Sequence, residues 1–319
     1  FSTNGVDSHV VLTAQGQDVT RLRGSIIDRD TRFTAGKPYQ IFDSLVVSPG
    51  ITLTLEPGTR LYFHDKAYMR VDGTLHSLGT ADAHVDMTGD RTGNVVGQIS
   101  FDIMSRQWGG VFFSSGSKGN IMAHTDLRNT TYGVNVNGDG STTTEDPALT
   151  LLNSRLHNSG DVVLYSSHAS IVAAGTEFAE GSYGLVSLIG GSHRFDHCTM
   201  ANNYLFTAIG GPALQLGHIN AENDDESGLP YLKADITNTI IYGLGSELSH
   251  GDLNDTEVYL RRCLLRSEGE DDEHFVACIW GEDPLYYTVR ADYLFDYRLK
   301  ADSPARGAAD ESIALPQSD

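Results

Sequence analysis

The chain has 319 residues, with 22 Lys and Arg against 42 Asp and Glu, and therefore a formal net charge of −20 at pH 7. Phosphates need a basic surface, so this balance argues against nucleic acid, and it argues against a polyanionic glycan unless calcium bridges the charges. The simpler role of such a charge is to keep the particle dispersed in water. No apolar run approaches the about 20 residues that cross a bilayer.

The first 38 residues form a separate segment in our reading. Residues 10–14, Val-Val-Leu-Thr-Ala, predict one strand, and a polar stretch continues to Lys37. We expect residues 1–38 to cap the structure that follows, or to finish a preceding domain. The chain begins at Phe1 with neither a charged leader nor an apolar segment, so we expect any targeting signal to be removed or to lie outside this fragment.

From Pro38 onward the apolar runs are short and rich in β-branched and aromatic residues. Clear examples are residues 45–47, 51–55, 60–63, 68–71, 111–113 and 162–165. Gly, Pro, Asn, Asp or Ser bounds each run, which predicts strands of about 4 to 6 residues that end in turns. The i, i+3, i+4 spacing of an amphipathic helix does not occur. Residues 90–107 and 139–145 break the pattern and are expected to be loops.

Residues 148–203 repeat every 22 positions. Leu156, Phe178 and Met200 are 22 residues apart, and a small residue stands two positions before each of them. With two later copies, this small-residue column comprises Ser154, Thr176, Cys198, Thr239 and Cys263. Equal spacing of equivalent positions is typical of a solenoid, and strands of this length fill the coils of a parallel β-helix. We therefore expect the small residues to form an interior ladder and the apolar column to be core.

The repeat predicts one all-β domain. We assign residues 39–300 to the parallel β-helix and residues 301–319 to a loosely held C-terminal tail. The spacing of 41 between Met200 and Ile241 exceeds one period, so residues in the range 217–227 are expected to be inserted. A second acidic run, residues 268–274, also interrupts the coils.

The three cysteines do not predict a disulfide. Cys198 and Cys263 would stand two coils apart in one ladder, at about 9 to 10 Å, beyond the about 7 Å limit between Cα atoms. We interpret both as buried fillers, and the spacing does not place Cys278.

Several stretches together resemble a known family. They are Asn4-Gly5 with residues 12–18, Leu-Thr-Leu-Glu-Pro-Gly-Thr at 53–59, Tyr-Phe-His at 62–64, Gly-Asp-Arg at 89–91, Gln-Trp-Gly-Gly at 107–110, residues 195–202, and Asp-Tyr-Arg-Leu at 296–299 before Ser303-Pro304-Ala305. The set resembles the right-handed parallel β-helix surface lipoproteins of Bacteroidetes, which have a pectate-lyase-like fold. The resemblance implies a single-stranded, right-handed solenoid behind a β-sandwich-like region. It also implies an outer-membrane, cell-surface or secreted location with an upstream lipid anchor, and no established activity.

Catalytic signatures are missing from the sequence. The Asn-Thr-Asp, Gly-His-Gly and Arg-Ile-Lys motifs of polygalacturonase-like enzymes do not occur, nor does a nucleophile elbow, a phosphate loop or a dinucleotide fingerprint. The histidines show no metal-ligand spacing; His193 and His197 would share a strand face without a third ligand. We therefore expect no catalytic residue, metal or cofactor. Calcium on Asp224, Asp225 and Glu226, with Lys233 or Arg261 as the base, is the alternative to a solvated acidic loop.

Aromatic side chains provide the best hint of binding, because they stack on sugar rings. The candidates are Trp108, Tyr132, Tyr165, Tyr183, Tyr204, Tyr231, Trp280, Tyr286 and Tyr287. We place the candidate ligand site in a groove beside the insertion, lined by Tyr204, Tyr231, Glu222, Asp224 and Asp225. Separately, Asp43-Ser44-Leu45 resembles the sites at which Bacteroidetes attach O-glycans.

The leading hypothesis is a non-catalytic surface lipoprotein that binds a neutral glycan or a partner protein, as an accessory to a nutrient-uptake complex of the outer membrane. One alternative is a polysaccharide-degrading lyase or hydrolase that uses residues 222–226. Another is a structural spacer.

Overall fold

The computed structural model describes residues 2–7, 18–220 and 228–314. These residues form strands, turns and loops, with a single 3₁₀ turn, η1 (Phe101–Ile103), among them. The described part of the chain contains no helix that is long and apolar enough to span a membrane. Because strands are almost the only regular elements among the described residues, the all-β expectation is confirmed.

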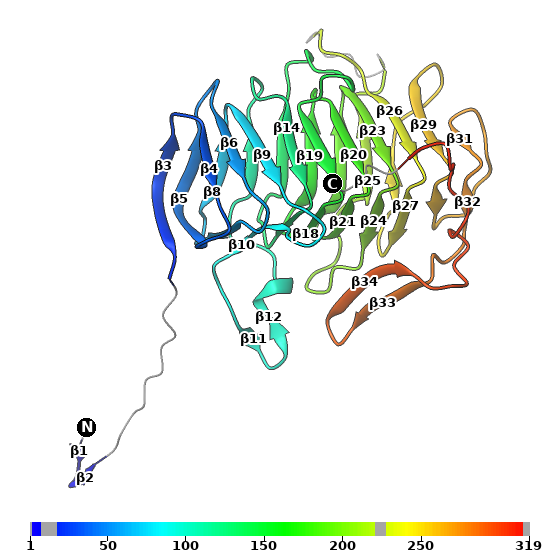
Figure 1. Cartoon of the computed structure of the whole chain (residues 1–319). Helices are drawn as coiled ribbons and strands as arrows, with labels where there is room; N and C mark the ends of the chain where they lie inside the picture. Colours follow the sequence, from blue (N-terminus) through cyan, green and yellow to red (C-terminus); the bar gives the residue numbers. More distant parts are fainter. Residues whose placement is uncertain (1, 8–17, 221–227, 315–319) are drawn as a thin grey trace.

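Most strands belong to two long parallel sheets that run side by side along the molecule (Figure 1). The ten-stranded sheet contains, in spatial order, β4 (Thr31–Phe33), β6 (Thr52–Leu55), β9 (Thr74–Leu78), β14 (Asn120–Ala123), β17 (Leu149–Leu152), β20 (Ile171–Ala174), β23 (Ser192–Asp196), β26 (Lys233–Thr237), β29 (Glu257–Arg261) and β31 (Phe275–Val276). Each strand pairs in parallel with its counterpart in the next coil.

The second sheet contributes two strands to most coils. Stacked from coil to coil, these strands form two rows, which we call the first and the second ribbon. The first ribbon comprises β7 (Arg60–Phe63), β10 (Val85–Gly89), β15 (Thr125–Arg128), β18 (Arg155–Ser159), β21 (Glu177–Gly181), β24 (Thr199–Asn202), β27 (Ile240–Gly243), β30 (Leu264–Leu265) and β32 (Ile279–Trp280). The second ribbon comprises β8 (Tyr68–Val71), β13 (Val111–Phe113), β16 (Val134–Asn137), β19 (Val162–Ser167), β22 (Gly184–Ile189), β25 (Leu214–Gly217) and β28 (Leu248–Ser249). The fold is thus a parallel β-solenoid.

The predicted apolar column lies inside the solenoid. Leu156, Phe178, Met200, Ile241 and Leu265 pair in register from coil to coil and are fully buried. Burial of each such side chain stabilises the fold by about 1.5–3 kcal/mol. Because alternate residues of a strand face opposite sides, their neighbours line the outer wall.

The predicted small-residue ladder occupies the corner between the ten-stranded sheet and the first ribbon. Ser154 and Thr239 donate hydrogen bonds to the carbonyl oxygens two residues earlier, at 2.9 and 3.0 Å, and Cys198 Sγ lies 3.4 Å from the Asp196 carbonyl. The chain turns this corner through a left-handed residue, such as Asn153 (φ 47°) or Gly175 (φ 59°). Asn and Gly adopt this conformation at low cost, so the sequence favours the corner.

Parallel pairing starts earlier than the expected boundary at residue 39. β3 (Thr20–Ile27) already pairs in parallel with β5 (Tyr39–Val47), and β5 pairs with both β7 and β8. The strand expected at 10–14 lies outside the described residues. Short antiparallel pairs join β1 (Ser2–Thr3) to β2 (Val6–Asp7) and β11 (Asn94–Val96) to β12 (Ile99–Ser100).

A third antiparallel hairpin joins β33 (Tyr286–Ala291) to β34 (Leu294–Leu299). It lies within the range expected to be solenoid, yet it packs across the outside of the wall. The β11–β12 loop and the β33–β34 hairpin project from the same side of the solenoid (Figure 1).

Candidate functional site

An open groove of about 520 Å³ follows the turns that connect the first ribbon to the second. Five consecutive coils line it with Arg106, Thr131, Tyr132, Gly160, Asp161, Ser182, Tyr183, Ala208 and Gly210. We call this feature the corner groove. It combines aromatic rings, hydroxyl groups and one charge of each sign.

Two tyrosines on the corner groove are exposed to solvent. Tyr132 is 52% exposed and Tyr183 is 46% exposed. The pairing of β16 with β19 and of β19 with β22 places their turns two coils apart. At about 4.7–4.9 Å per coil, the two turns are about 9–10 Å apart along the axis. Asp161 lies in the coil between them.

The Tyr183 ring rests on the glycines of the following coil. A Cβ placed on Gly210 would lie 2.9 Å from Tyr183 Cδ2, and one on Gly211 would lie 2.8 Å from Cε1. The Gly211 amide also donates a hydrogen bond to the Tyr183 carbonyl at 2.5 Å. Only glycines allow the ring to lie this close, so the backbone fixes its position.

Tyr132 ends a short run of aromatic contacts. Its ring centroid is 6.3 Å from that of Phe112, which in turn lies 6.1 Å from Tyr68 in a T-shaped arrangement. Because these residues come from three consecutive coils, the aromatic surface continues from the corner groove along the wall.

Arg106 crosses the floor of the groove. Its Nη2 donates hydrogen bonds to the Gly160 carbonyl at 2.5 Å and to Ser182 Oγ at 3.4 Å. A Cβ on Gly160 would lie 2.4 Å from Arg106 Cγ, so glycine is required beneath the side chain. The guanidinium is therefore positioned before any ligand arrives, which lowers the entropic cost of binding.

Of the five predicted ligand residues, the structure describes Tyr204 and Tyr231, and these two lie at different corners of the coil. Tyr204 is only 5% exposed, and its hydroxyl lies 2.6 Å from Ser105 Oγ, so it holds the 90–107 loop against the wall. Tyr231 is 37% exposed and lies 4.8 Å from the His218 ring, in the turn between β25 and β26. Tyr204 follows β24 instead, at a different corner of the coil.

Glu222, Asp224 and Asp225 lie outside the described residues, as does the calcium alternative built on them. Elsewhere, residues 18–220 and 228–314 contain no group of three or more His, Cys, Asp and Glu side chains that could hold a metal ion. His193 Nε2 contacts the Gly190 carbonyl at 2.9 Å, and His197 Nε2 contacts the Ile313 carbonyl at 2.8 Å. Ser44 is half-buried in β5, where it pairs with Tyr68.

Sequence reasoning included Tyr132 and Tyr183 among the aromatic candidates but did not select them, and it missed Arg106 and Asp161. A signal was present, because Thr131-Tyr132-Gly133 and Ser182-Tyr183-Gly184 repeat the order hydroxyl, tyrosine, glycine. Another candidate, Trp108, is fully buried and stacks on Phe63 at 3.9 Å.

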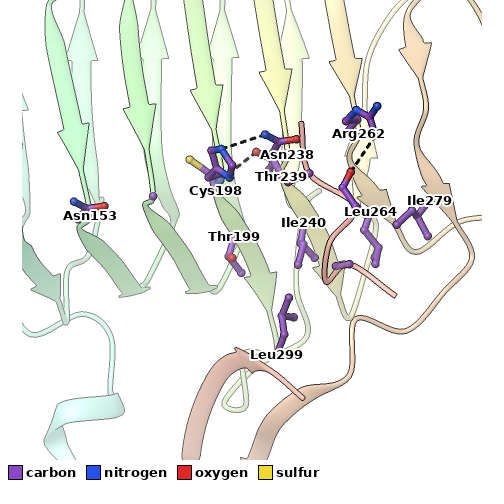
Figure 2. A pocket seen from close by; sticks show the side chains of 15 residues that line it. Asn153, Cys198, Thr199, Asn238, Thr239, Ile240, Arg262, Leu264, Ile279 and Leu299 are labelled. Atoms are coloured by element: carbon purple, nitrogen blue, oxygen red, sulfur yellow. Dashed lines mark hydrogen bonds between the residues drawn. The ribbon is translucent and has the colours of Figure 1, made fainter. Parts of the chain in front are cut away.

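A second cavity, of about 420 Å³, lies under the C-terminal segment (Figure 2). Asn238 exchanges hydrogen bonds with the Asp310 backbone at 2.7 and 3.2 Å, and Arg262 Nη1 donates one to the Ala308 carbonyl at 3.2 Å. The expected loosely held tail is therefore tied to the solenoid as far as Ile313. Because these polar groups already bind the tail, this cavity is a weaker candidate for a ligand.

A buried carboxyl group lies beneath the β33–β34 hairpin. Glu180 is 2% exposed, and burial raises the pKa of its carboxyl to about 8, although a hydrogen bond from Tyr297 opposes the shift. The hairpin covers it by packing Tyr286 and Tyr297 against Ala179 and Ala201. A ligand cannot reach Glu180 in this arrangement, so the contact fixes the hairpin.

Comparison with protein-family models, curated proteins and solved structures found no match.

Proposed function

We propose that the protein binds a neutral glycan along the corner groove. The observation that carries this proposal is the pair of exposed tyrosines, Tyr132 and Tyr183, held two coils apart on either side of Asp161. Sugar rings present C–H faces that stack on aromatic rings, and hydroxyl groups that pair with Arg and Asp. The separation of about 9–10 Å is comparable to the repeat of two linked hexoses in an extended glycan.

The charge of the site favours a neutral ligand. Arg106 and Asp161 contribute one charge of each sign to the groove, whereas the whole chain carries −20. A polyanionic glycan would be repelled by this field without gaining a cluster of cations.

The wider setting follows the resemblance found in the sequence. We propose a right-handed, single-stranded winding with an N-terminal cap, because parallel crossover connections are right-handed in about 98% of cases. We also propose a Bacteroidetes lipoprotein at the cell surface, where glycan capture would serve a nutrient-uptake complex of the outer membrane. Pull-down from native outer membranes tests this setting; recovery of no transport component would argue against it.

Alanine variants test the binding site. Tyr132→Ala and Tyr183→Ala should each weaken glycan affinity roughly 2- to 12-fold, the equivalent of about 0.5–1.5 kcal/mol per aromatic contact. Tyr287→Ala is the matched control, because Tyr287 is 61% exposed but does not line the corner groove. Calorimetric titration with an oligosaccharide selected from a glycan array measures the affinities. Equal affinity of all four proteins would exclude the corner groove.

Glycan cleavage is the second candidate function. Arg155 of β18 pairs in register with Asp126 of β15 in the preceding coil and with Glu177 of β21 in the following coil. Asp126 and Glu177 therefore lie two coils apart on the outer wall. That spacing of about 9–10 Å is close to the about 6.5–9.5 Å between the carboxyl groups of inverting glycosidases. Burial raises the pKa of the Glu177 carboxyl, as a general acid requires. Turnover that survives in Glu177→Gln would eliminate this candidate.

A further inference from the structure

Two cysteines belong to neighbouring coils at the C-terminal end of the small-residue ladder, which we also call the corner ladder. β29 and β31 pair Arg261 with Val276, and β30 and β32 pair Leu264 with Ile279. Two residues separate these pairs in each coil, so Cys263 and Cys278 occupy equivalent positions one coil apart. The strand spacing of about 4.8 Å falls within the about 4.4–6.8 Å that separates the Cα atoms of disulfides.

Both thiols point in the same direction along the ladder. Cys263 Sγ lies 3.4 Å from the Ile236 carbonyl, and Cys278 Sγ lies 3.4 Å from the Leu260 carbonyl, each in the preceding coil. Both are free thiols; Cys263 is fully buried, whereas Cys278 is partly exposed. The pair therefore has one thiol that solvent can reach and one that stands behind it.

The ionisation of the two groups suits them to different roles. A hydrogen bond from the Cys263 thiol lowers the pKa of Cys278, whereas burial raises the pKa of Cys263. A thiolate is the nucleophile in disulfide exchange, so Cys278 is the attacking group and Cys263 the resolving group.

We propose that Cys263 and Cys278 form a redox-active dithiol that a small organic disulfide oxidises to an intramolecular disulfide. The Cys278 thiolate attacks one sulfur of the small disulfide, which forms a mixed disulfide and releases one small thiolate. The Cys263 thiol then gives its proton to that thiolate and displaces the second small thiolate, which takes a proton from water. The two cysteines are oxidised by two electrons, and the small disulfide is reduced to two thiols.

The bond would fix the acidic loop between the two cysteines. Asp271 in this loop accepts hydrogen bonds from the amides of Ala277 and Cys278, at 2.7 and 3.1 Å, and from Trp280 Nε1 at 3.1 Å. Oxidation would thus hold the loop and β32 against the preceding coil.

Cys198 provides an internal control. Its neighbours in the ladder are Thr176 and Thr239, since β21, β24 and β27 pair in register. With no thiol one coil away, Cys198 has no partner for exchange.

Peptide mapping of the full chain tests the proposal. The protein is incubated with oxidised glutathione, its remaining thiols are alkylated under denaturing conditions, and its peptides are analysed by mass spectrometry. We expect a linked Cys263–Cys278 peptide pair, lighter by two hydrogen atoms than the free peptides and separated by dithiothreitol, with Cys198 alkylated. Stable glutathionylation of Cys278 beside an alkylated Cys263, or alkylation of all three thiols, would overturn the proposal.

Cys263→Ser keeps the ladder polar and small while removing the resolving thiol. This variant should accumulate the mixed disulfide at Cys278, and oxidation should raise the melting temperature of the wild type but not of the variant. The same melting shift in both proteins would also overturn the proposal.

Discussion

The hydroxyl of Tyr297 donates a hydrogen bond to the buried carboxyl group of Glu180, 117 positions earlier in the chain. Asn203 completes the contact. Its backbone N–H donates to Glu180 Oε1 at 3.3 Å, and its side-chain Nδ2 donates to the Tyr297 hydroxyl at 3.3 Å. This polar cluster, enclosed by Tyr286, explains how a hairpin outside the coils is held against the wall.

The raised pKa of Glu180 makes stability depend on pH. The ordinary value is 4.5 and the folded value is about 8, so between these limits the folded chain keeps a proton that the unfolded chain has lost. Stability should therefore fall as pH rises from 4.5 to about 8 and then level off. Urea titrations of the wild type and Glu180→Gln, compared at each pH, isolate this contribution. A difference that stays constant or grows in favour of the wild type would contradict the assignment.

Tyr297→Phe should destabilise the docked hairpin. The change leaves Glu180 and Asn203 buried without the hydroxyl that both contact, at a cost of about 1–3 kcal/mol in the free energy of unfolding. Tyr287→Phe, on the exposed face of the same hairpin, is the control and should cost nearly nothing. Denaturant unfolding of both variants decides the point, since equal midpoints would show that the buried hydroxyl contributes little.

Gly210→Ala should weaken glycan binding without altering a tyrosine. The added Cβ would approach Tyr183 Cδ2 to 2.9 Å, so the ring must leave its position over the backbone. Gly116→Ala is the matched control, because no atom lies within 4 Å of a Cβ at that site. Titration with the selected oligosaccharide should show a loss of affinity for Gly210→Ala alone. If both variants bind like the wild type, the fixed position of Tyr183 is irrelevant to binding.

Thr239→Val should destabilise the corner ladder. The Thr239 hydroxyl donates to the Thr237 carbonyl at 3.0 Å and accepts from the Cys198 amide at 3.3 Å, and valine keeps the shape but removes both bonds. Because the amide is buried, we expect a loss of about 1–3 kcal/mol in unfolding free energy. Thr34→Val, at an exposed position, is the control. A loss no greater than that of Thr34→Val would show that the ladder's hydrogen bonds do not support the coil.

The solenoid could be predicted because its signals are local and periodic. The positions of Leu156 and Ser154 recur every coil, since parallel stacking demands the same inward residue at the same place. The ladder position of Cys278 could not be predicted, because its coil is shorter than the others. Cys278 follows Cys263 by 15 positions, whereas the repeat predicts an equivalent residue after 22. The ladder at this end became visible only from the pairing of β30 with β32.

The site could not be predicted in the same way, because the exposure of an aromatic ring depends on which segments return to cover it. Tyr204 and Tyr183 occupy comparable turns, yet the 90–107 loop reaches back to bury Tyr204, whereas Gly210 and Gly211 leave Tyr183 open. Those contacts join residues distant in sequence and leave no periodic trace.

A thermal-shift screen against neutral oligosaccharides tests glycan binding most directly, because a ligand that binds only the folded chain raises its melting temperature. The wild type is compared with the Tyr132→Ala/Tyr183→Ala double variant. We predict that at least one oligosaccharide raises the melting temperature of the wild type and leaves that of the double variant unchanged. Equal shifts in the two proteins, or no shift with any oligosaccharide, would contradict a glycan site in the corner groove.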